Sequence, residues 1–155
     1  MKFLGGGRRG AGHPLPGPWT VGMNPAVEDE LGIRRTLAAY CVLVDDGDFA
    51  AVAELFAPDG SFAYRGEVAS GRDAVLRWFE ENHPPEQRGK HVCVNPLIDI
   101  DGTRAKVVSD FVFLRFIDGT LTTKFVGRYV DAFVRVDGHW RIERRDIAVL
   151  QPPSR

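Results

Sequence analysis

Four polar side chains of this sequence have the types and positions that proton transfer requires. They are Asp45 at the end of a predicted helix, His91 at the start of a predicted strand, Tyr40 within the helix and Arg145 in the last strand. An imidazole beside a carboxylate can accept and return a proton near neutral pH. A phenol or a guanidinium can stabilise the negative charge that develops. Whether the four meet depends on the elements that carry them.

Asp45 and His91 each have a structural explanation as well as a chemical one. The helix macrodipole disfavours a carboxylate at the end of a helix by ~0.3–1 kcal/mol, and Asp46 and Asp48 add like charge to Asp45. This local pattern is typical of a solvated acidic turn. A lone histidine at a strand start is typically a structural or surface residue. If side chains alternate strictly along this strand, His91 shares one face with Cys93, Asn95 and Leu97.

Tyr40, Arg144 and Arg145 are open to the same two interpretations. Tyr40 lies on the apolar side of its helix, where a buried hydroxyl normally needs a partner and where a plain core aromatic is the simpler reading. Regular alternation along the last strand places Arg144, rather than Arg145, on the face of Trp140. An arginine that points inward needs a carboxylate or a ligand. The local pattern favours a surface ion pair with Glu143 or Asp146 for either arginine.

Helical periodicity runs from residue 26 to about residue 46, and this helix carries Tyr40 and Asp45. Its apolar face repeats at steps of four, three and four residues, at Ile33, Leu37, Tyr40 and Val44. Gly47 ends this helix, and Asp48 caps a short second helix over Phe49–Phe56. A turn at residues 58–60 and a short strand over Ser61–Tyr64 precede a third helix over Arg72–Asn82.

The second half of the chain is predicted to be four strands, His91–Ile100, Ala105–Ile117, Leu121–Val136 and His139–Leu150. They are separated by the pairs Asp101–Gly102, Asp118–Gly119 and Asp137–Gly138. Asp-Gly suits a tight hairpin because both central residues of its turn adopt positive φ. Helices followed by an antiparallel meander predict an α+β domain with the helices on one face of the sheet. Residues 105–117 are apolar on both faces, so a second subunit or an enclosed cavity should cover the other face.

The overall composition excludes several functions without indicating one. The chain has 155 residues, 44% of them hydrophobic, and a formal net charge of −1, so nucleic acid and acidic membranes are not expected partners. No apolar run approaches the ~20 residues of a membrane span. Cys41 and Cys93 fit neither a metal site nor a CxxC motif, and no histidine pair has metal-ligand spacing. We therefore expect no metal and a reducing, cytoplasmic location.

Residues 1–24 differ in composition from the rest of the chain. They hold seven glycines and three prolines, and no apolar region follows their basic start. Glycine at this density disfavours folding, so we expect a disordered arm rather than a secretory signal. A single domain is expected over residues 25–155.

The element order and several short motifs resemble the SnoaL-like branch of the nuclear-transport-factor-2-like superfamily. The motifs are residues 40–48 (YCVLVDDGD), 55–60 (LFAPDG), 71–72 (GR), 90–96 (KHVCVNP), 127–131 (GRYVD) and 137–142 (DGHWRI). The resemblance covers residues 28–150. Within the branch, the chain is most similar to enzymes of the scytalone dehydratase, bile acid dehydratase and hexachlorocyclohexane dehydrochlorinase type.

This resemblance implies a fold and an active site. The fold is a cone-shaped, curved antiparallel sheet wrapped around three N-terminal helices and enclosing a pocket. Such enzymes use an aspartate at the end of the first helix and a histidine at the start of the first long strand, the places of Asp45 and His91. Tyr40 and Arg145 are similar to further active-site positions of some members. The second strand histidine of scytalone dehydratase has no evident counterpart in this sequence.

The implied function is a cofactor-independent lyase or isomerase that acts on a small, hydrophobic, cyclic substrate. Asp45 would fix the tautomer of His91, His91 would remove a proton, and Tyr40 or Arg145 would stabilise an enolate or a departing hydroxide. A carboxylate oxygen within ~3.2 Å of a His91 nitrogen, facing a cavity, would support this hypothesis. The expected pocket wall is aromatic and consists of Phe62, Tyr64, Trp78, Phe79, Phe111, Phe113, Phe125 and Tyr129.

Two other functions are compatible with the same resemblance. One is a polyketide cyclase, in which Asp45 would serve as the acid and base of an intramolecular aldol closure. The other is a non-catalytic ligand-binding or assembly module, similar to the small subunit of ring-hydroxylating dioxygenases. In each case we expect a homodimer or a homotrimer with no cofactor.

Overall fold

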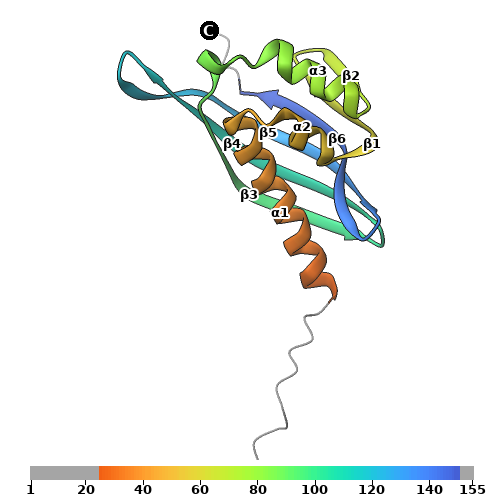
Figure 1. The fold of residues 1–155 in the computed structure, drawn as a ribbon. Helices are drawn as coiled ribbons and strands as arrows, with labels where there is room; N and C mark the ends of the chain where they lie inside the picture. Colours follow the sequence, from red (N-terminus) through yellow and green to blue (C-terminus); the bar gives the residue numbers. More distant parts are fainter. Residues whose placement is uncertain (1–24, 151–155) are drawn as a thin grey trace, which may run out of the picture.

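The computed structural model describes residues 25–150 as three α-helices and one six-stranded sheet (Figure 1). The helices are α1 (Pro25–Asp46), α2 (Phe49–Glu54) and α3 (Arg72–Asn82), followed by a short 3₁₀ helix, η1 (Pro85–Gln87). The strands are β1 (Phe56–Tyr64), β2 (Glu67–Ser70), β3 (Lys90–Asp101), β4 (Arg104–Ile117), β5 (Thr120–Val136) and β6 (His139–Val149). The arm expected over residues 1–24 lies outside the described residues, as do residues 151–155.

The sheet has the strand order β2-β1-β6-β5-β4-β3, and the three helices lie along one side of it (Figure 1). The α+β class and the antiparallel meander of β3, β4, β5 and β6 are confirmed. The sheet as a whole is mixed and open, because β1 pairs with β6 in parallel. The predicted short strand is also longer than expected, and β2 was not predicted. A parallel contact between segments about 80 residues apart has no hairpin signal in the sequence, which explains the difference.

The Asp-Gly pairs form turns in the expected places. Both residues have positive φ in the pairs Asp118–Gly119, at 50° and 79°, and Asp137–Gly138, at 49° and 78°. The first pair differs, since Asp101 belongs to β3 and only Gly102 has positive φ, at 58°. The two matching turns have the backbone geometry that joins twisted antiparallel strands without splaying them.

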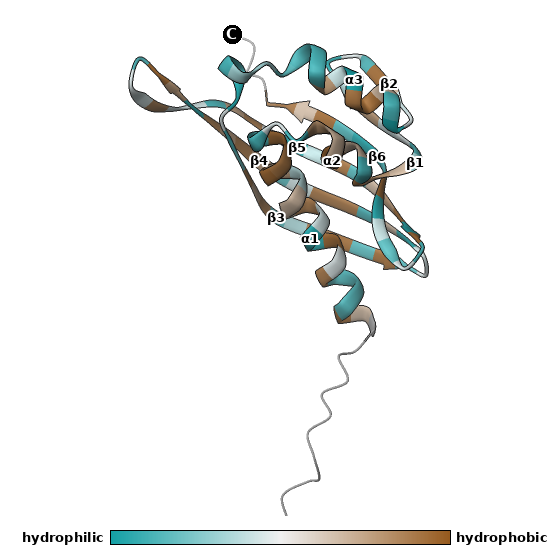
Figure 2. Ribbon diagram, viewed as in Figure 1, coloured by the Kyte–Doolittle hydropathy of each residue, from teal (hydrophilic) through white to brown (hydrophobic). Residues whose placement is uncertain are grey.

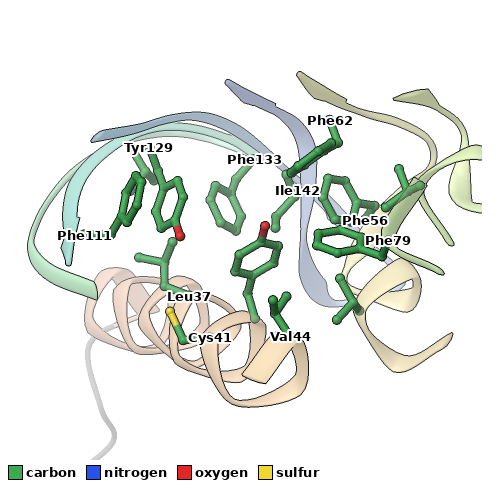
Figure 3. Close-up of a cluster of buried hydrophobic side chains, with 14 of the residues drawn as sticks. Leu37, Cys41, Val44, Phe56, Phe62, Phe79, Phe111, Tyr129, Phe133 and Ile142 are labelled. Atoms are coloured by element: carbon green, nitrogen blue, oxygen red, sulfur yellow. The ribbon is translucent and has the colours of Figure 1, made fainter. Parts of the chain in front are cut away.

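The core lies between the helices and the concave side of the sheet. The predicted face of α1 is confirmed, since Ile33, Leu37, Tyr40 and Val44 are each at most 3% exposed. Figure 3 shows residues of α1 beneath Phe111, Tyr129 and Phe133 of the sheet, and Figure 2 shows hydrophobic residues in brown along the central strands. Each such aliphatic or aromatic side chain contributes about 1.5–3 kcal/mol when it is fully buried.

Two shifts in strand register decide which side chains face this core. In β3, the shift falls between Val94 and Leu97, around Asn95, whose φ is 52°. Leu97 is therefore 75% exposed, and the alternation predicted from His91 is wrong beyond the shift. A β-bulge inserts one residue and moves every following side chain to the other face.

The second shift, in the β5–β6 pairing, corrects the prediction for the last strand. Phe133 pairs with Ile142, while the adjacent Ala132 pairs with Arg144, so one residue of β6 is unpaired. Arg145 is consequently turned to the inner face and is fully buried, whereas Arg144 lies outside. Strict alternation had predicted the opposite placement of the two arginines relative to the buried residues of the strand.

The expectations about membrane spans, metal sites and cysteines can be compared with the structure of residues 25–150. No helix there is long and apolar enough to cross a membrane. Within the same residues, no cluster of three or more histidine, cysteine or acidic side chains could hold a metal ion. Cys41 and Cys93 are both free thiols. The cytoplasmic location stays a prediction.

Candidate active site

The end of α1 and the start of β3 lie side by side, and this contact brings Asp45 to His91. Asp45 Oδ1 lies 2.7 Å from His91 Nδ1, which is inside the ~3.2 Å expected of a working pair. The backbone N–H of His91 donates to both carboxylate oxygens, at 3.1 Å each. The side chain of Asp45 is 3% exposed and that of His91 is 13% exposed.

Further contacts offset the cost of burying the Asp45 carboxylate at a helix C-terminus. Lys90 Nζ lies 3.6 Å from Asp45 Oδ2 and 3.8 Å from Asp46 Oδ1.

Because an ionised carboxylate only accepts hydrogen bonds, the ring Nδ1 of His91 must be the donor. A neutral His91 held in this way keeps the lone pair on Nε2, the nitrogen that is free to accept a proton.

His91 lies at the wall of a cavity of about 430 Å³ between the helices and the sheet. Tyr40 also lines the cavity. The aromatic residues predicted for its wall do so as well: Phe62, Tyr64, Trp78, Phe79, Phe111, Phe113, Phe125 and Tyr129. Asp45 and Arg145 do not reach the cavity surface. The rim is polar and consists of Arg65, Glu67, Asn82, Gln87, Arg115 and Lys124.

The aromatic wall fixes the ring of His91 by direct packing. The ring centroids of His91 and Phe113 are 4.4 Å apart, at an interplanar angle of 30°. Phe111 stacks on Tyr129 with centroids 4.4 Å apart and an angle of 13°. Gly127 makes this stack possible, because a Cβ at that position would lie 2.6 Å from the Phe111 ring. Such contacts limit the orientations that the imidazole can adopt.

Arg145 lies behind the cavity wall rather than at its surface. Its guanidinium forms two hydrogen bonds with Asp131, at 2.9 and 2.7 Å, and both side chains are fully buried. It also lies against two rings, 4.0 Å from the Tyr40 centroid and 4.2 Å from the Tyr129 centroid. The surface ion pair expected for this region belongs instead to Arg144, which lies 2.8 Å from Asp146.

Burial controls the protonation of the two tyrosines at this site. It raises the pKa of Tyr40 above the ordinary value of 10.0, although the charge of Arg145 acts in the opposite direction. Burial likewise raises the pKa of Tyr129. Both phenols are therefore protonated near neutral pH. Tyr40 can offer its O–H to an oxygen in the cavity.

A family model described as the SnoaL-like domain matches residues 25–146. The chain belongs to this SnoaL-like family. The family resemblance inferred from the motifs is thus confirmed, and the SnoaL-like fold includes dehydratases and cyclases. No curated protein matches the chain.

Several solved structures of other proteins are similar in fold to this SnoaL-like domain. A Mycobacterium tuberculosis protein of unknown function is 28% identical, with a TM-score of 0.78, over 84% of this chain and 79% of that one. A protein described as a candidate scytalone dehydratase, from Novosphingobium aromaticivorans, is 25% identical, with a TM-score of 0.72, over 81% and 87%. A Catenulispora acidiphila protein in complex with S-DNPA is 24% identical, with a TM-score of 0.70, over 81% and 95%, and shows the fold alone.

One residue of the SnoaL-like site was not among the predicted site residues. His83 follows α3 and lines the cavity, with its ring centroid 6.3 Å from that of His91. Burial, assisted by the nearby His91, lowers the pKa of His83 to about 4, so the ring is neutral. Its Nε2 is buried without a partner among the described residues. The spacing of Val75, Phe79 and His83 at steps of four was a usable signal, because it places all three on one helix face.

Proposed function

We propose that this protein is a cofactor-independent lyase or isomerase that removes a proton from a small, hydrophobic, cyclic substrate. The observation that carries the proposal is the buried contact of 2.7 Å between Asp45 and His91 at the wall of an aromatic cavity. A pocket of about 430 Å³ is within the usual range for small-molecule sites. Its floor residues are each at most 4% exposed, and an apolar environment of this kind strengthens electrostatic interactions.

The chemistry begins with a substrate C–H bond next to a carbonyl group. His91 Nε2 accepts the proton, the electron pair moves onto the carbonyl oxygen, and the Tyr40 O–H donates a hydrogen bond to that oxygen. Asp45 stabilises the imidazolium that forms. In an elimination, the electron pair then expels a hydroxide, which takes the proton from His91 and leaves as water. In an isomerisation, His91 returns the proton to a different carbon.

Arg145 acts in this proposal through other residues, because it does not reach the cavity. Its guanidinium holds Asp131 and packs against the rings of Tyr40 and Tyr129. We assign it to positioning the Tyr40 phenol rather than to direct contact with the substrate. The positive charge also favours any negative charge that develops near the Tyr40 oxygen.

The comparisons support the proposal at the level of the family. The relative described as a candidate scytalone dehydratase covers most of this chain. A polyketide cyclase would use the same first step, proton abstraction in the cavity, and would differ in forming a ring. Product analysis separates the two reactions.

Deuterium exchange in D₂O tests the proton abstraction before the natural substrate is known. The probes are a panel of cyclic β-hydroxyketones and β,γ-unsaturated cyclic ketones, followed by ¹H NMR. We expect the protein to accelerate loss of the α-proton signal and His91→Gln to reduce this acceleration by ~10²–10⁴. Equal exchange rates with the protein and with His91→Gln, at unchanged folding, would contradict the proposal.

We also propose that a second copy of the chain covers the outer face of the sheet. The strand pairing aligns Val92 with Val112 and Val112 with Val126 across three strands. Val92 and Val126 are 42% and 40% exposed, so this ladder is an open apolar surface. Exposed apolar patches commonly mark protein interfaces. Sedimentation velocity should show an oligomer, and Val126→Lys should convert it to a monomer. A monomer at all concentrations would contradict this.

A further inference from the structure

The cavity has an apolar floor and a positively charged mouth. Its floor is formed by buried residues that are each at most 4% exposed: Tyr40, Phe62, Phe79, Phe111, Phe113 and Tyr129. Three cations, Arg65, Arg115 and Lys124, stand at the rim beside one carboxylate, Glu67. The chain as a whole carries a formal net charge of −1, so this positive charge is a local feature of the mouth.

Two of the cations converge on one aromatic ring. The Arg65 guanidinium lies 5.6 Å from the Phe125 centroid and 5.2 Å from that of Tyr64. Lys124 Nζ lies 5.9 Å from the same Phe125 centroid. Neither cation forms an ion pair with a residue in the range 25–150. An aromatic ring carries no formal negative charge, so these cation–π contacts position the two cations without neutralising them.

The other charged groups at the mouth are held by neutral partners. Arg115 Nη2 donates to the backbone oxygen of Glu86 at 2.7 Å, which keeps its guanidinium at the cavity wall. Glu67 Oε2 accepts from the Trp78 indole at 2.8 Å. This hydrogen bond joins Glu67 to Trp78 of the cavity wall. Glu67 forms no ion pair with Arg65, two residues before it. Because three cations and one carboxylate line the mouth, the described residues leave it with a net positive charge.

We propose that the substrate is a cyclic carboxylic acid, whose apolar ring lies on the aromatic floor and whose carboxylate binds Arg65 and Lys124. A guanidinium and an ammonium that face a cleft of low dielectric attract an anion more strongly than the same groups in bulk water. Arg115 adds attraction at longer range. The inference rests on the proposed function for the reacting end at His91, while binding of the anion is independent of turnover.

Calorimetric titration of a matched ligand pair tests this inference. The probes are adamantane-1-carboxylate and its neutral analogue adamantane-1-carboxamide. At about 20 mM ionic strength, we expect the carboxylate to bind at least ~10-fold more tightly than the amide. The advantage should fall strongly at 0.5 M NaCl, where charges are screened within ~4 Å. The double variant Arg65→Gln/Lys124→Gln should lose most of the preference for the carboxylate and leave the affinity for the amide unchanged.

Two further variants separate this inference from the alternatives. Arg77→Gln/Lys106→Gln removes the same charge from exposed positions outside the cavity, and it should keep the preference for the carboxylate. His91→Gln should also keep it, so a failure of the proton-exchange experiment would leave the preference intact. The inference is overturned if the parent protein binds both probes equally, binds neither, or keeps its preference after loss of Arg65 and Lys124.

Discussion

The carboxylate of Asp45 binds His91 through two groups at once, the ring Nδ1–H and the backbone N–H. The ring contact sets the tautomer of the imidazole, and the backbone contact fixes the start of β3 against the end of α1. A rotation of the ring alone would break only the first contact. A substitution that removes the charge of Asp45 but keeps an oxygen acceptor should therefore keep the backbone contact and lose the electrostatic effect on the ring.

Asp45→Asn should retain the fold and lose most of the activity. The amide oxygen can still accept from the backbone N–H of His91, but the variant cannot stabilise an imidazolium. We expect kcat to fall by ~10²–10⁴ with little change in KM. Steady-state kinetics on an exchange-active ketone measures this. Asp46→Asn is the control, since the Asp46 side chain is 63% exposed, and it should leave kcat unchanged. Full activity of Asp45→Asn would contradict the assigned role.

The sequence predicted those parts of the fold that depend on local periodicity. The buried face of α1 follows from the spacing of Ile33, Leu37, Tyr40 and Val44, and two hairpin turns follow from Asp-Gly pairs. The meeting of Asp45 and His91 was expected from the family resemblance, because these residues are 46 positions apart and no local pattern connects them.

The remaining features depend on long-range geometry. The parallel pairing of β1 with β6 leaves no turn signal in the sequence. The inward placement of Arg145 results from one unpaired residue in β6, and a two-residue periodicity cannot locate such a bulge. His83 was not predicted as a site residue because a lone histidine before two prolines is typical of a surface turn, although its spacing from Phe79 matched a helix face.

Tyr40→Phe should lower activity without unfolding the protein. The substitution removes only the hydroxyl, which burial keeps protonated, from a residue that lines the same cavity as His91. We expect kcat to fall by roughly 10²-fold, which is the lower end of the range for loss of one donor to a developing oxyanion. The matched variant Tyr64→Phe removes a hydroxyl nearer the rim and should have a smaller effect. Equal losses in the two variants would indicate a general effect on the cavity.

Arg145→Met should be strongly destabilising. It leaves the Asp131 carboxylate buried without its partner, which costs about 3–5 kcal/mol. The double variant Arg145→Met/Asp131→Leu removes both charges and should recover much of that loss. Urea unfolding of the double-mutant cycle measures the coupling between the two residues. Arg144→Met, which breaks an exposed pair, should cost at most about 1 kcal/mol. A similar cost for both arginines would exclude a structural role for the buried pair.

His83 should make the protein less stable as the pH falls from about 6.5 to 4. Burial, assisted by the nearby His91, lowers its pKa from 6.5 to about 4, so in this range the unfolded chain binds a proton that the folded chain does not. Stability from this residue is therefore complete above pH 6.5 and lost progressively below it, by about 1–2 kcal/mol after allowance for partial exposure. Urea unfolding should show that His83→Gln flattens this part of the pH profile, whereas the exposed control His139→Gln leaves it unchanged. Identical profiles for the parent protein and His83→Gln would exclude a neutral, buried His83.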